Sequence, residues 1–557
     1  MFPLDATEFS QIFSNQIYIY LGISLLNSVL LFFSSQKFLL VLQQCGYRGV
    51  RYFKWLGNRE TPYMSRLMLL CLLGFLFFCV LNTCFAPMFG LTVSSYIGFG
   101  SYLLFTGLYI HTERTVNAKV PLKKTKRLAR LSVSFCVVLA AVTFGFLVLF
   151  DYLAFVINDQ TVAVLRYALI CALPILTPFI LFISYCLNEP FEEIVRQYYL
   201  RTAENKLKNS DVIKIGITGS FGKTTVKEIL RTILSQRFRV LATPESYNTP
   251  LGIALTVRGL DSSHDVFIAE MGARYKGDIA ALAKMVKPRY GVLTGVNNQH
   301  IETFKNEENI LKTKYELFER LTDDGVGFFG SDNNKSVELF EKFDKKKYLA
   351  GIKGEGQLVT AENITMDSKG MSFDLIIGGQ NTVRCSTVLL GKHNVRNICL
   401  AAAVAYEMGL TADEIAAGIG RLQSIGHRLE LVPNNKNVII IDDSYNSNED
   451  GVNAAMEVLD MFEGRKIVLT PGLVELGKYE NVVNLEFGKK LAAHVDQVII
   501  IGHHNAETII NGLLDGGMQR ENIKFAKTLN KGNAILNEIM KEGDVVMFEN
   551  DLPDNYS

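Results

Sequence analysis

The sequence predicts a membrane-embedded α-helical region followed by α/β domains, and three observations support this fold class. The first 190 residues contain five long apolar stretches, residues 218–225 form a phosphate loop, and from Val212 onward short β-rich runs alternate with amphipathic stretches. Such alternation is typical of parallel sheets with helices on both faces. A chain of 557 residues is too long for one core at about 150 residues per domain. We expect three parts: a membrane region at 1–195, a P-loop-type central domain at 196–428 and a Rossmann-like C-terminal α/β domain at 429–557.

The five apolar stretches are long enough to cross about 30 Å of hydrocarbon. They lie at about 16–35, 67–86, 90–110, 131–156 and 163–187. The first is not a cleavable signal, because the residues before it carry Asp5 and Glu8 and no basic side chain. Basic residues are concentrated between the first and second stretches and between the third and fourth. By the positive-inside rule, the chain crosses the cytoplasmic membrane several times, with its N-terminus outside and the α/β domains in the cytoplasm.

Charge is unevenly divided along the chain. Residues 1–190 contain 14 Lys and Arg against 7 Asp and Glu, and the remaining residues contain 43 against 49. A mildly acidic soluble part argues against a nucleic acid partner, which requires a basic footprint. The basic and aromatic segment Gly46–Leu56 is typical of an interfacial anchor, with a lipid phosphate contact as the alternative. The nine cysteines lack Cys-x-x-Cys spacing, so we expect free thiols in core positions.

The phosphate loop predicts a site for ATP and Mg²⁺. In the run Thr-Gly-Ser-Phe-Gly-Lys-Thr-Thr, Gly219 and Gly222 let backbone amides face phosphate oxygens, and Lys223 adds a positive charge. Thr224 offers a hydroxyl to the metal ion. The predicted nucleotide contacts in this loop are Thr218, Gly219, Ser220, Phe221, Gly222, Lys223, Thr224 and Thr225.

The α/β part has recognisable strands. They are predicted at Asp265–Glu270, Arg289–Val296 and Asn437–Asp442. The segment 326–390 has short strands and turns and predicts a small antiparallel addition, and a new βα series begins after about Arg428.

Further candidate residues are ambiguous when each is taken alone. Glu270 ends a strand, where open α/β sheets bind ligands, but a strand-end Glu is more often a surface residue or a helix cap. A lone His300 is commonly structural, and Lys314 reads as the solvated face of a helix. The segment Asp442–Asn448 reads as a turn rich in side-chain caps.

Taken in order, these segments resemble the Mur ligase family, the ATP-dependent amide ligases of cell-wall precursor synthesis, and most closely its D-alanyl-D-alanine-adding branch. The resemblance covers roughly residues 211–545. Ile217 stands where the general phosphate loop has its first glycine, which matches the family variant Thr-Gly-x-x-Gly-Lys-Thr. The motifs are Thr218–Thr225, Asn248–Gly252, Glu270–Gly277, His300–Glu302, Lys314–Phe318, Gly391–Asn397, His427–Glu430, Asp442–Asn448 and Glu475–Gly477.

The resemblance implies roles for the matching residues. Lys223 and the loop amides would hold the β- and γ-phosphates, while Thr224, Glu270 and His300 would help to bind Mg²⁺. Lys314 would be carried as a carbamate that binds a second metal ion, with Lys312 as the competing candidate. Lys223, His300 and Lys314 are thus the expected catalytic residues. The expected adenine and ATP contacts outside the loop are Asn394, Asn397, Arg428 and Asp443.

The implied reaction is activation of a carboxylate as an acyl phosphate, which an amine then attacks. The wall ligases begin with a domain that binds a uridine diphosphate sugar, and this chain has five predicted spans in its place. Its C-terminus, Val545–Ser557, is acidic where the D-alanyl-D-alanine branch is basic. We therefore hypothesise a lipid-linked or membrane-associated glycan acceptor and an amino acid or short peptide as amine. The alternatives are classical D-alanyl-D-alanine addition, a polymerising ligase resembling poly-γ-glutamate synthases, and an ATP-sensing membrane regulator or transporter.

Overall fold

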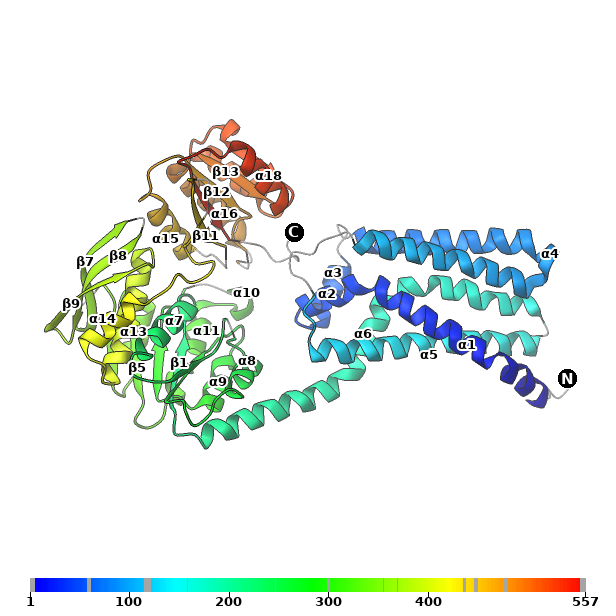
Figure 1. The fold of residues 1–557 in the computed structure, drawn as a ribbon, viewed down its shortest axis with the longest axis horizontal. Helices are drawn as coiled ribbons and strands as arrows, with labels where there is room; N and C mark the ends of the chain where they lie inside the picture. The colour runs from blue at the N-terminus through cyan, green and yellow to red at the C-terminus, as the bar shows by residue number, and fades with distance from the viewer. Residues whose placement is uncertain are drawn as a thin grey trace. The chain divides into compact units, whose positions relative to one another are not determined.

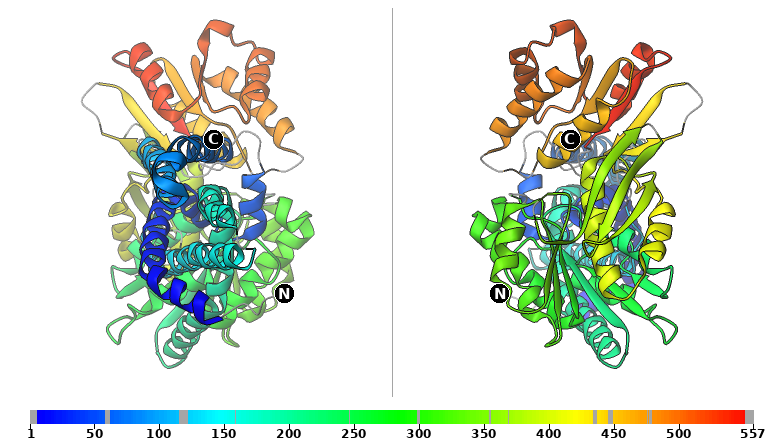
Figure 2. Two further views of the ribbon diagram at one scale, coloured as in Figure 1. Left: turned by 90° about the vertical axis from the view of Figure 1, so that its right-hand side faces the viewer. Right: turned by 90° about the vertical axis from the view of Figure 1, so that its left-hand side faces the viewer.

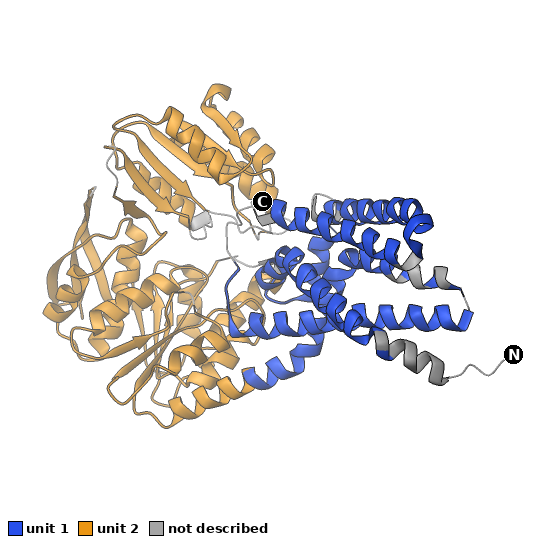
Figure 3. Cartoon of the chain, turned by 45° about the vertical axis from the view of Figure 1, so that its right-hand side comes forward, with its two compact units in different colours: residues 1–195, 553–555 blue, residues 196–552, 556–557 orange. Residues whose placement is uncertain are grey.

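The computed structural model contains two compact units (Figures 1 and 3). The first comprises residues up to Val195, and the second begins at Arg196. The structure describes residues 6–57, 62–114, 122–157, 159–245, 247–297, 301–353, 355–367, 369–433, 437–444, 449–474, 476 and 479–550.

The first unit is helical. Its helices are α1 (Ala6–Ser34), α2 (Gln36–Gln44), α3 (Gly49–Leu56), α4 (Pro62–Arg114), α5 (Lys126–Ile157) and α6 (Gln160–Lys208). The long α4 is interrupted at Gly90, whose φ is +80°. Within the described part of the chain, five helical segments are long and apolar enough to cross a membrane, in agreement with the predicted stretches. They are Gln16–Ser34, Ser65–Gly90, Val93–Thr112, Lys126–Ile157 and Tyr167–Lys208.

Neutral hydrogen bonds link the helices of the first unit. The side-chain amide of Asn27 on α1 donates to Thr143 Oγ1 on α5 at 3.0 Å, and the Tyr102 hydroxyl on α4 donates to Asn27 Oδ1 at 2.8 Å. Asn27, Tyr102 and Thr143 are all buried, and Thr143 donates in turn to the Leu139 carbonyl at 2.8 Å. The network therefore satisfies polar groups inside an apolar bundle.

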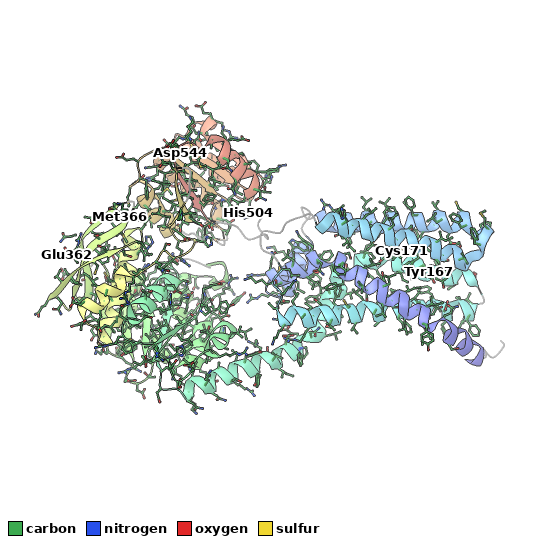
Figure 4. The ribbon with its side chains drawn as sticks, viewed as in Figure 1. Tyr167, Cys171, Glu362, Met366, His504 and Asp544 are labelled. Atoms are coloured by element: carbon green, nitrogen blue, oxygen red, sulfur yellow. The ribbon has the colours of Figure 1, made fainter. Side chains whose placement is uncertain are left out.

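The prediction for the cysteines was right about pairing and only partly right about burial. All nine thiols are free. Cys71, Cys171, Cys385 and Cys399 are buried, and Figure 4 shows Cys171 within the helical unit. In contrast, Cys79, Cys84 and Cys186 are exposed. They lie on the outer faces of long apolar helices, where an apolar run does not distinguish an inner face from an outer one.

The second unit begins with the end of α6. Ala203 and Leu207 are buried among residues of the central domain, including Ile253 and Phe267. Lys206 donates a hydrogen bond to the Arg258 carbonyl at 2.9 Å. The last turns of this helix are therefore part of the core of the central domain.

The central domain contains a nine-stranded sheet with the order β2-β3-β1-β4-β5-β6-β7-β8-β9. Its strands are β1 (Ile213–Thr218), β2 (Val240–Ala242), β3 (Val266–Glu270), β4 (Tyr290–Leu293), β5 (Val326–Gly330), β6 (Lys347–Ala350), β7 (Gln357–Asp367), β8 (Gly370–Ile377) and β9 (Asn381–Thr387). Its helices are α7 (Lys223–Leu234), α8 (Pro250–Val257), α9 (Asp278–Val286), α10 (Ile301–Phe304), α11 (Glu307–Tyr315), α12 (Asn334–Lys342), α13 (Lys392–Glu407) and α14 (Ala412–Gly420).

Helices cover both faces of this sheet, as predicted. Along β3, Val266 and Ile268 join the core that contains α7 and α13, whereas Phe267 and Ala269 join the core that contains α8 and α9. This alternation follows from the two-residue period of a strand. The right-hand view of Figure 2 shows α13 and α14 (yellow) beside β7 to β9.

The prediction of an antiparallel addition over 326–390 was wrong for its first part. Strands β5 and β6 pair in parallel, because α12 forms a crossover connection between them. Only β7, β8 and β9 are antiparallel, and they extend the same sheet.

The C-terminal domain has its own six-stranded sheet, with the order β10-β11-β15-β12-β13-β14. Only β10 pairs antiparallel, and the remaining pairs are parallel. The strands are β10 (Glu430–Val432), β11 (Ile439–Asp443), β12 (Lys466–Thr470), β13 (Gln497–Ile501), β14 (Ile523–Ala526) and β15 (Val545–Glu549). The helices are α15 (Glu449–Leu459), α16 (Glu480–His494), α17 (Ala506–Asp515) and α18 (Leu529–Ile539).

Candidate active site

The predicted phosphate loop connects the carboxyl end of β1 to the first turn of α7. Gly219 and Gly222 have φ values of +154° and +73°, in the region that favours glycine. A Cβ atom on Gly219 would lie 2.0 Å from Thr294 Oγ1, so no larger residue fits there without moving the loop. The loop conformation thus requires glycine both for its backbone angles and for its packing.

Other contacts hold the loop against the neighbouring strand ends. The buried Thr218 hydroxyl donates to the Met271 carbonyl at 3.1 Å, and the Ser220 amide donates to the Gly295 carbonyl at 2.8 Å. The Phe221 ring packs against Gly295. Thr224 and Thr225 form the first turn of α7, with Thr225 buried.

Lys223 lies across this loop. Its ammonium group donates to the carbonyls of Gly219 at 2.8 Å and Ser220 at 3.1 Å. Burial lowers the pKa of Lys223 to about 8; the Glu270 carboxylate opposes this shift, and Arg428 adds to it. The positive charge is therefore held beside the amides that would face phosphate oxygens.

Glu270 lies at the end of β3 and is 1% exposed, unlike the surface residue that its pattern alone would favour. Asn248 donates its side-chain amide to Glu270 Oε1 at 3.1 Å. The other oxygen, Oε2, has no hydrogen-bond partner among the described residues, and it lies 3.5 Å from Nζ of Lys227. A buried carboxylate oxygen without a hydrogen bond is an available metal ligand.

Lys314 lies on α11 and is 3% exposed, so reading it from the pattern alone as a solvated residue was wrong. Burial, together with the nearby Lys223 and against Asp278 and Glu316, lowers its pKa to about 7. The competing candidate, Lys312, is 54% exposed and forms an ion pair with Glu308 at 2.5 Å. The two lysines therefore occupy different environments, and Lys314 lies near the loop lysine Lys223.

A cavity of about 320 Å³ adjoins the loop at Phe221 and Gly222. The four residues expected to contact adenine and ATP outside the loop all line it, and they are Asn394, Asn397, Arg428 and Asp443. Asn397 Nδ2 donates to Asn394 Oδ1 at 3.3 Å. Burial raises the pKa of Asp443 to about 6, although the Leu429 amide donates to this carboxylate at 3.2 Å and opposes the shift.

Three predicted motifs extend beyond the described residues. His300 lies outside them, as do Glu475, Gly477 and residues 445–448. Within Asp442–Asn448, Asp442 and Asp443 end strand β11, and the Ser444 amide donates to Asp442 Oδ1 at 3.0 Å, so the predicted turn itself stays a prediction. The C-terminal residues 551–557 are also outside the described part.

Comparison with known proteins identifies the family. The Mur ligase middle domain matches residues 217–405, and the Mur ligase glutamate ligase domain matches residues 427–549, so together they span more than half of the chain. The chain belongs to the Mur ligase family. It is also 30% identical over 293 residues to UDP-N-acetylmuramoyl-tripeptide–D-alanyl-D-alanine ligase of Escherichia coli. The aligned region covers 52% of this chain and 64% of that ligase. The corresponding Bacillus subtilis ligase is 28% identical over 338 residues, covering 60% and 72%.

Solved structures agree on the fold of this Mur ligase. MurF from Acinetobacter baumannii has a TM-score of 0.59 at 24% identity, covering 65% of this chain and 78% of that one. MurF from Thermotoga maritima, solved in complex with ADP, has a TM-score of 0.57 at 24% identity, covering 64% and 80%. The match to the Escherichia coli ligase spans less than two thirds of that protein's length. Both family matches lie beyond residue 216 of the present chain.

Sequence reasoning missed several residues of this Mur ligase site. Asp332 follows β5 and lines the cavity, where it accepts the Ile352 amide at 2.9 Å and pairs with Arg396 at 3.2 Å. The strand-end rule applied to Glu270 would have found it. His393 also lines the cavity, and burial lowers its pKa to about 4, so it is neutral at physiological pH. The fully buried Lys227 gave no signal, since it reads as one more helix residue.

The residues present fit magnesium bound together with a nucleotide. Among the described residues, no three His, Cys, Asp or Glu side chains cluster to form a self-sufficient metal site. Mg²⁺ is usually held by one or two carboxylates together with substrate phosphates and water. The available oxygen of Glu270 and the Thr224 hydroxyl match that requirement.

Proposed function

We propose that this Mur ligase is an ATP-dependent, ADP-forming amide ligase. A carboxylate oxygen attacks the γ-phosphorus of ATP and ADP leaves; an amine then attacks the acyl carbon, and inorganic phosphate leaves as the amine loses a proton. The observation that carries the proposal is the convergence of Lys223, Glu270 and Lys314 at one glycine-containing loop. Phosphoryl transfer depends mainly on positioning and charge stabilisation, which these groups supply.

The loop residues bind and orient the triphosphate. Its backbone amides would face the β- and γ-phosphates, and Lys223 would exchange its loop carbonyls for phosphate oxygens. Thr224, Glu270 and His300 would hold Mg²⁺, which when bound neutralises charge developing on the transferred phosphoryl group. The adenosine would occupy the cavity lined by Asn394, Asn397, Arg428 and Asp443.

Lys314 is the preferred candidate for a carbamate. Carbamate formation requires a free amine, and a pKa of about 7 leaves a large uncharged fraction at neutral pH. The resulting anion would place a carboxylate-like oxygen beside Lys223 and would serve as a metal ligand. Lys312, in contrast, is 54% exposed and pairs with Glu308.

For the substrates, we propose D-alanyl-D-alanine as the amine and a UDP-N-acetylmuramoyl-tripeptide as the carboxylate. The support comes from the relatives that carry this reaction in their names. A second candidate is the same addition to a lipid-linked glycan, which the five apolar helical segments favour. In both cases the helical unit would lie in the cytoplasmic membrane, with the N-terminus outside and the ligase domains in the cytoplasm.

The test uses the full chain, purified from membranes and reconstituted in nanodiscs, with ATP, Mg²⁺ and D-alanyl-D-alanine. UDP-N-acetylmuramoyl-tripeptide and a lipid-linked muramoyl tripeptide are supplied separately, and products are analysed by mass spectrometry. A single D-alanyl-D-alanine increment with stoichiometric ADP is expected on the soluble acceptor. An increment on the lipid-linked acceptor alone would favour the second candidate. A ladder of masses would instead indicate polymerisation, and ATP hydrolysis independent of both substrates would refute the ligase assignment.

Vesicles prepared from the membranes that contain this protein test the proposed orientation of the chain. Protease added to sealed, right-side-out vesicles should leave the ligase domains intact until the membrane is opened. Cleavage of those domains in sealed vesicles would contradict the proposed topology.

A further inference from the structure

A buried lysine lies behind the proposed metal ligand. Lys227 is on α7, one helical turn beyond Lys223, and its side chain is 0% exposed. Its ammonium group lies 3.5 Å from Glu270 Oε2 and donates a hydrogen bond to the Glu245 carbonyl. A buried charge requires a partner, and Glu270 is the buried carboxylate that faces it.

Glu228 is a second carboxylate near Lys227, but it does not replace Glu270 as the partner of Lys227. It lies 3.4 Å from Lys227, but it is partly exposed and also pairs with Arg231 at 2.9 Å. Arg231 balances the Glu228 charge at the surface. Lys227 therefore remains the counter-charge of Glu270.

The surroundings of Glu270 are rich in positive charge. Lys223 interacts electrostatically with Glu270, and Nζ of Lys227 lies 3.5 Å from its Oε2. Two ammonium groups therefore face the Glu270 carboxylate, and Lys227 has the partly exposed Glu228 as a further partner. Such surroundings repel a bare divalent cation and attract an anion, and the complex of Mg²⁺ with ATP is an anion.

We propose that Lys227 is a positioning residue that balances the charge of Glu270 while no metal ion is bound. It thereby makes metal binding depend on the nucleotide. The inference rests on the proposed ATP-dependent function and adds the order in which the ligands enter. Lys227 donates a hydrogen bond to the Glu245 carbonyl, and Glu270 Oε2 accepts no hydrogen bond from the described residues, so this oxygen can turn to a metal ion that arrives with ATP. Asn248 keeps the other oxygen in place.

The experiment measures Mn²⁺ binding by electron paramagnetic resonance, using the full chain in nanodiscs. Wild-type protein is compared with Lys227→Met, Lys227→Arg and Glu270→Gln, each with and without a non-hydrolysable ATP analogue. Arg231→Met is the matched control, because it removes a positive charge from the same helix at a half-exposed position that pairs with Glu228. Binding that remains in Glu270→Gln is subtracted as background.

In the wild type, Mn²⁺ should bind at least about tenfold more tightly with the nucleotide than without it. Lys227→Met should bind Mn²⁺ alone about tenfold more tightly than the wild type does, and the gain should vanish in Lys227→Met/Glu270→Gln. Lys227→Arg and Arg231→Met should behave like the wild type.

Equal Mn²⁺ affinity with and without nucleotide in the wild type would overturn the inference. This measurement needs only the wild-type protein, so it can be made even if Lys227→Met does not fold. Unchanged metal affinity in a folded Lys227→Met protein would overturn it as well. Failure of the proposed function would look different: a fluorescent ATP analogue would not bind to the wild type, or ATP hydrolysis would not depend on the two substrates.

Discussion

In the helical unit, the described buried polar side chains are serine, threonine and asparagine, whereas the ligase unit also buries lysines and carboxylates. Asn27 and Thr143 of the helical unit satisfy each other across two helices. In the ligase unit, the buried Lys227 and Glu270 lie 3.5 Å apart, and the buried Lys314 interacts electrostatically with Lys223. Both units bury polar groups, but among the described residues only the ligase unit buries lysine, aspartate or glutamate side chains.

This difference separates packing from chemistry. A neutral hydrogen bond in an apolar interior satisfies both partners and requires no further ligand. A buried lysine is costly, and its pKa falls until a partner or a ligand compensates, as at Lys223 and Lys314. The buried charges around the loop therefore indicate where a charged substrate binds.

The largest expected effect is that of Lys223→Ala. Removing the charge that faces the phosphates should reduce acceptor-dependent phosphate release by about 1000-fold or more. Insertion of the helical unit into the membrane should be unchanged. The measurement is phosphate release on adding both substrates, together with the fraction of protein recovered in washed membranes.

Lys284→Ala is the control for this variant, because Lys284 is an exposed lysine of α9. It should retain wild-type turnover. Full acceptor-dependent turnover in Lys223→Ala would remove the basis for placing the chemistry at the loop.

A smaller, pH-dependent effect is expected at Lys314. The turnover of enzyme freed of carbon dioxide should rise about tenfold when bicarbonate is added. This factor is similar to the loss of activity seen when a residue that supports a metal ligand is removed. Only the uncharged amine reacts with carbon dioxide, and its fraction rises as pH increases through the pKa of about 7. Occupancy of the carbamate, assayed by release of labelled carbon dioxide from trapped protein, should therefore be greater at pH 8 than at pH 6.

Two variants distinguish the competing lysines. Lys314→Gln should lose the response to bicarbonate, while Lys312→Gln should keep it. The reverse result would transfer the carbamate to Lys312, and no response in the wild type would argue against a carbamate altogether.

The fold was largely predictable because local pattern and tertiary structure agree. The alternation along β3 and the loop before α7 place strands and helices without knowledge of distant contacts. The antiparallel reading of 326–350 failed for a physical reason. Strands β5 and β6 are short, and pairing direction depends on the crossover through α12, not on the strand residues themselves.

The site was predictable as a list of residues but not as a set of environments. The order of the motifs singled out Lys223, Glu270 and Lys314. In contrast, the burial of Lys314 depends on how α11 packs in the domain, and the same helix leaves Lys312 exposed. Lys227 depends on the Glu245 carbonyl and on Glu270, which come from other elements. Contacts of this kind leave no periodic signal in the sequence.

The smallest expected effect lies in the helical unit. Tyr102→Phe removes the hydroxyl that donates to Asn27 Oδ1, leaving a buried acceptor without that donor. The cost should be about 1 kcal/mol, seen as a fall of a few degrees in the thermal transition of the unit in detergent. Tyr18→Phe is the matched control, because Tyr18 is 82% exposed on α1 and should leave the transition unchanged. ATP turnover should be unaffected in both variants, because a neutral network serves packing; a large loss of turnover in Tyr102→Phe would mean that the helical unit takes part in the chemistry.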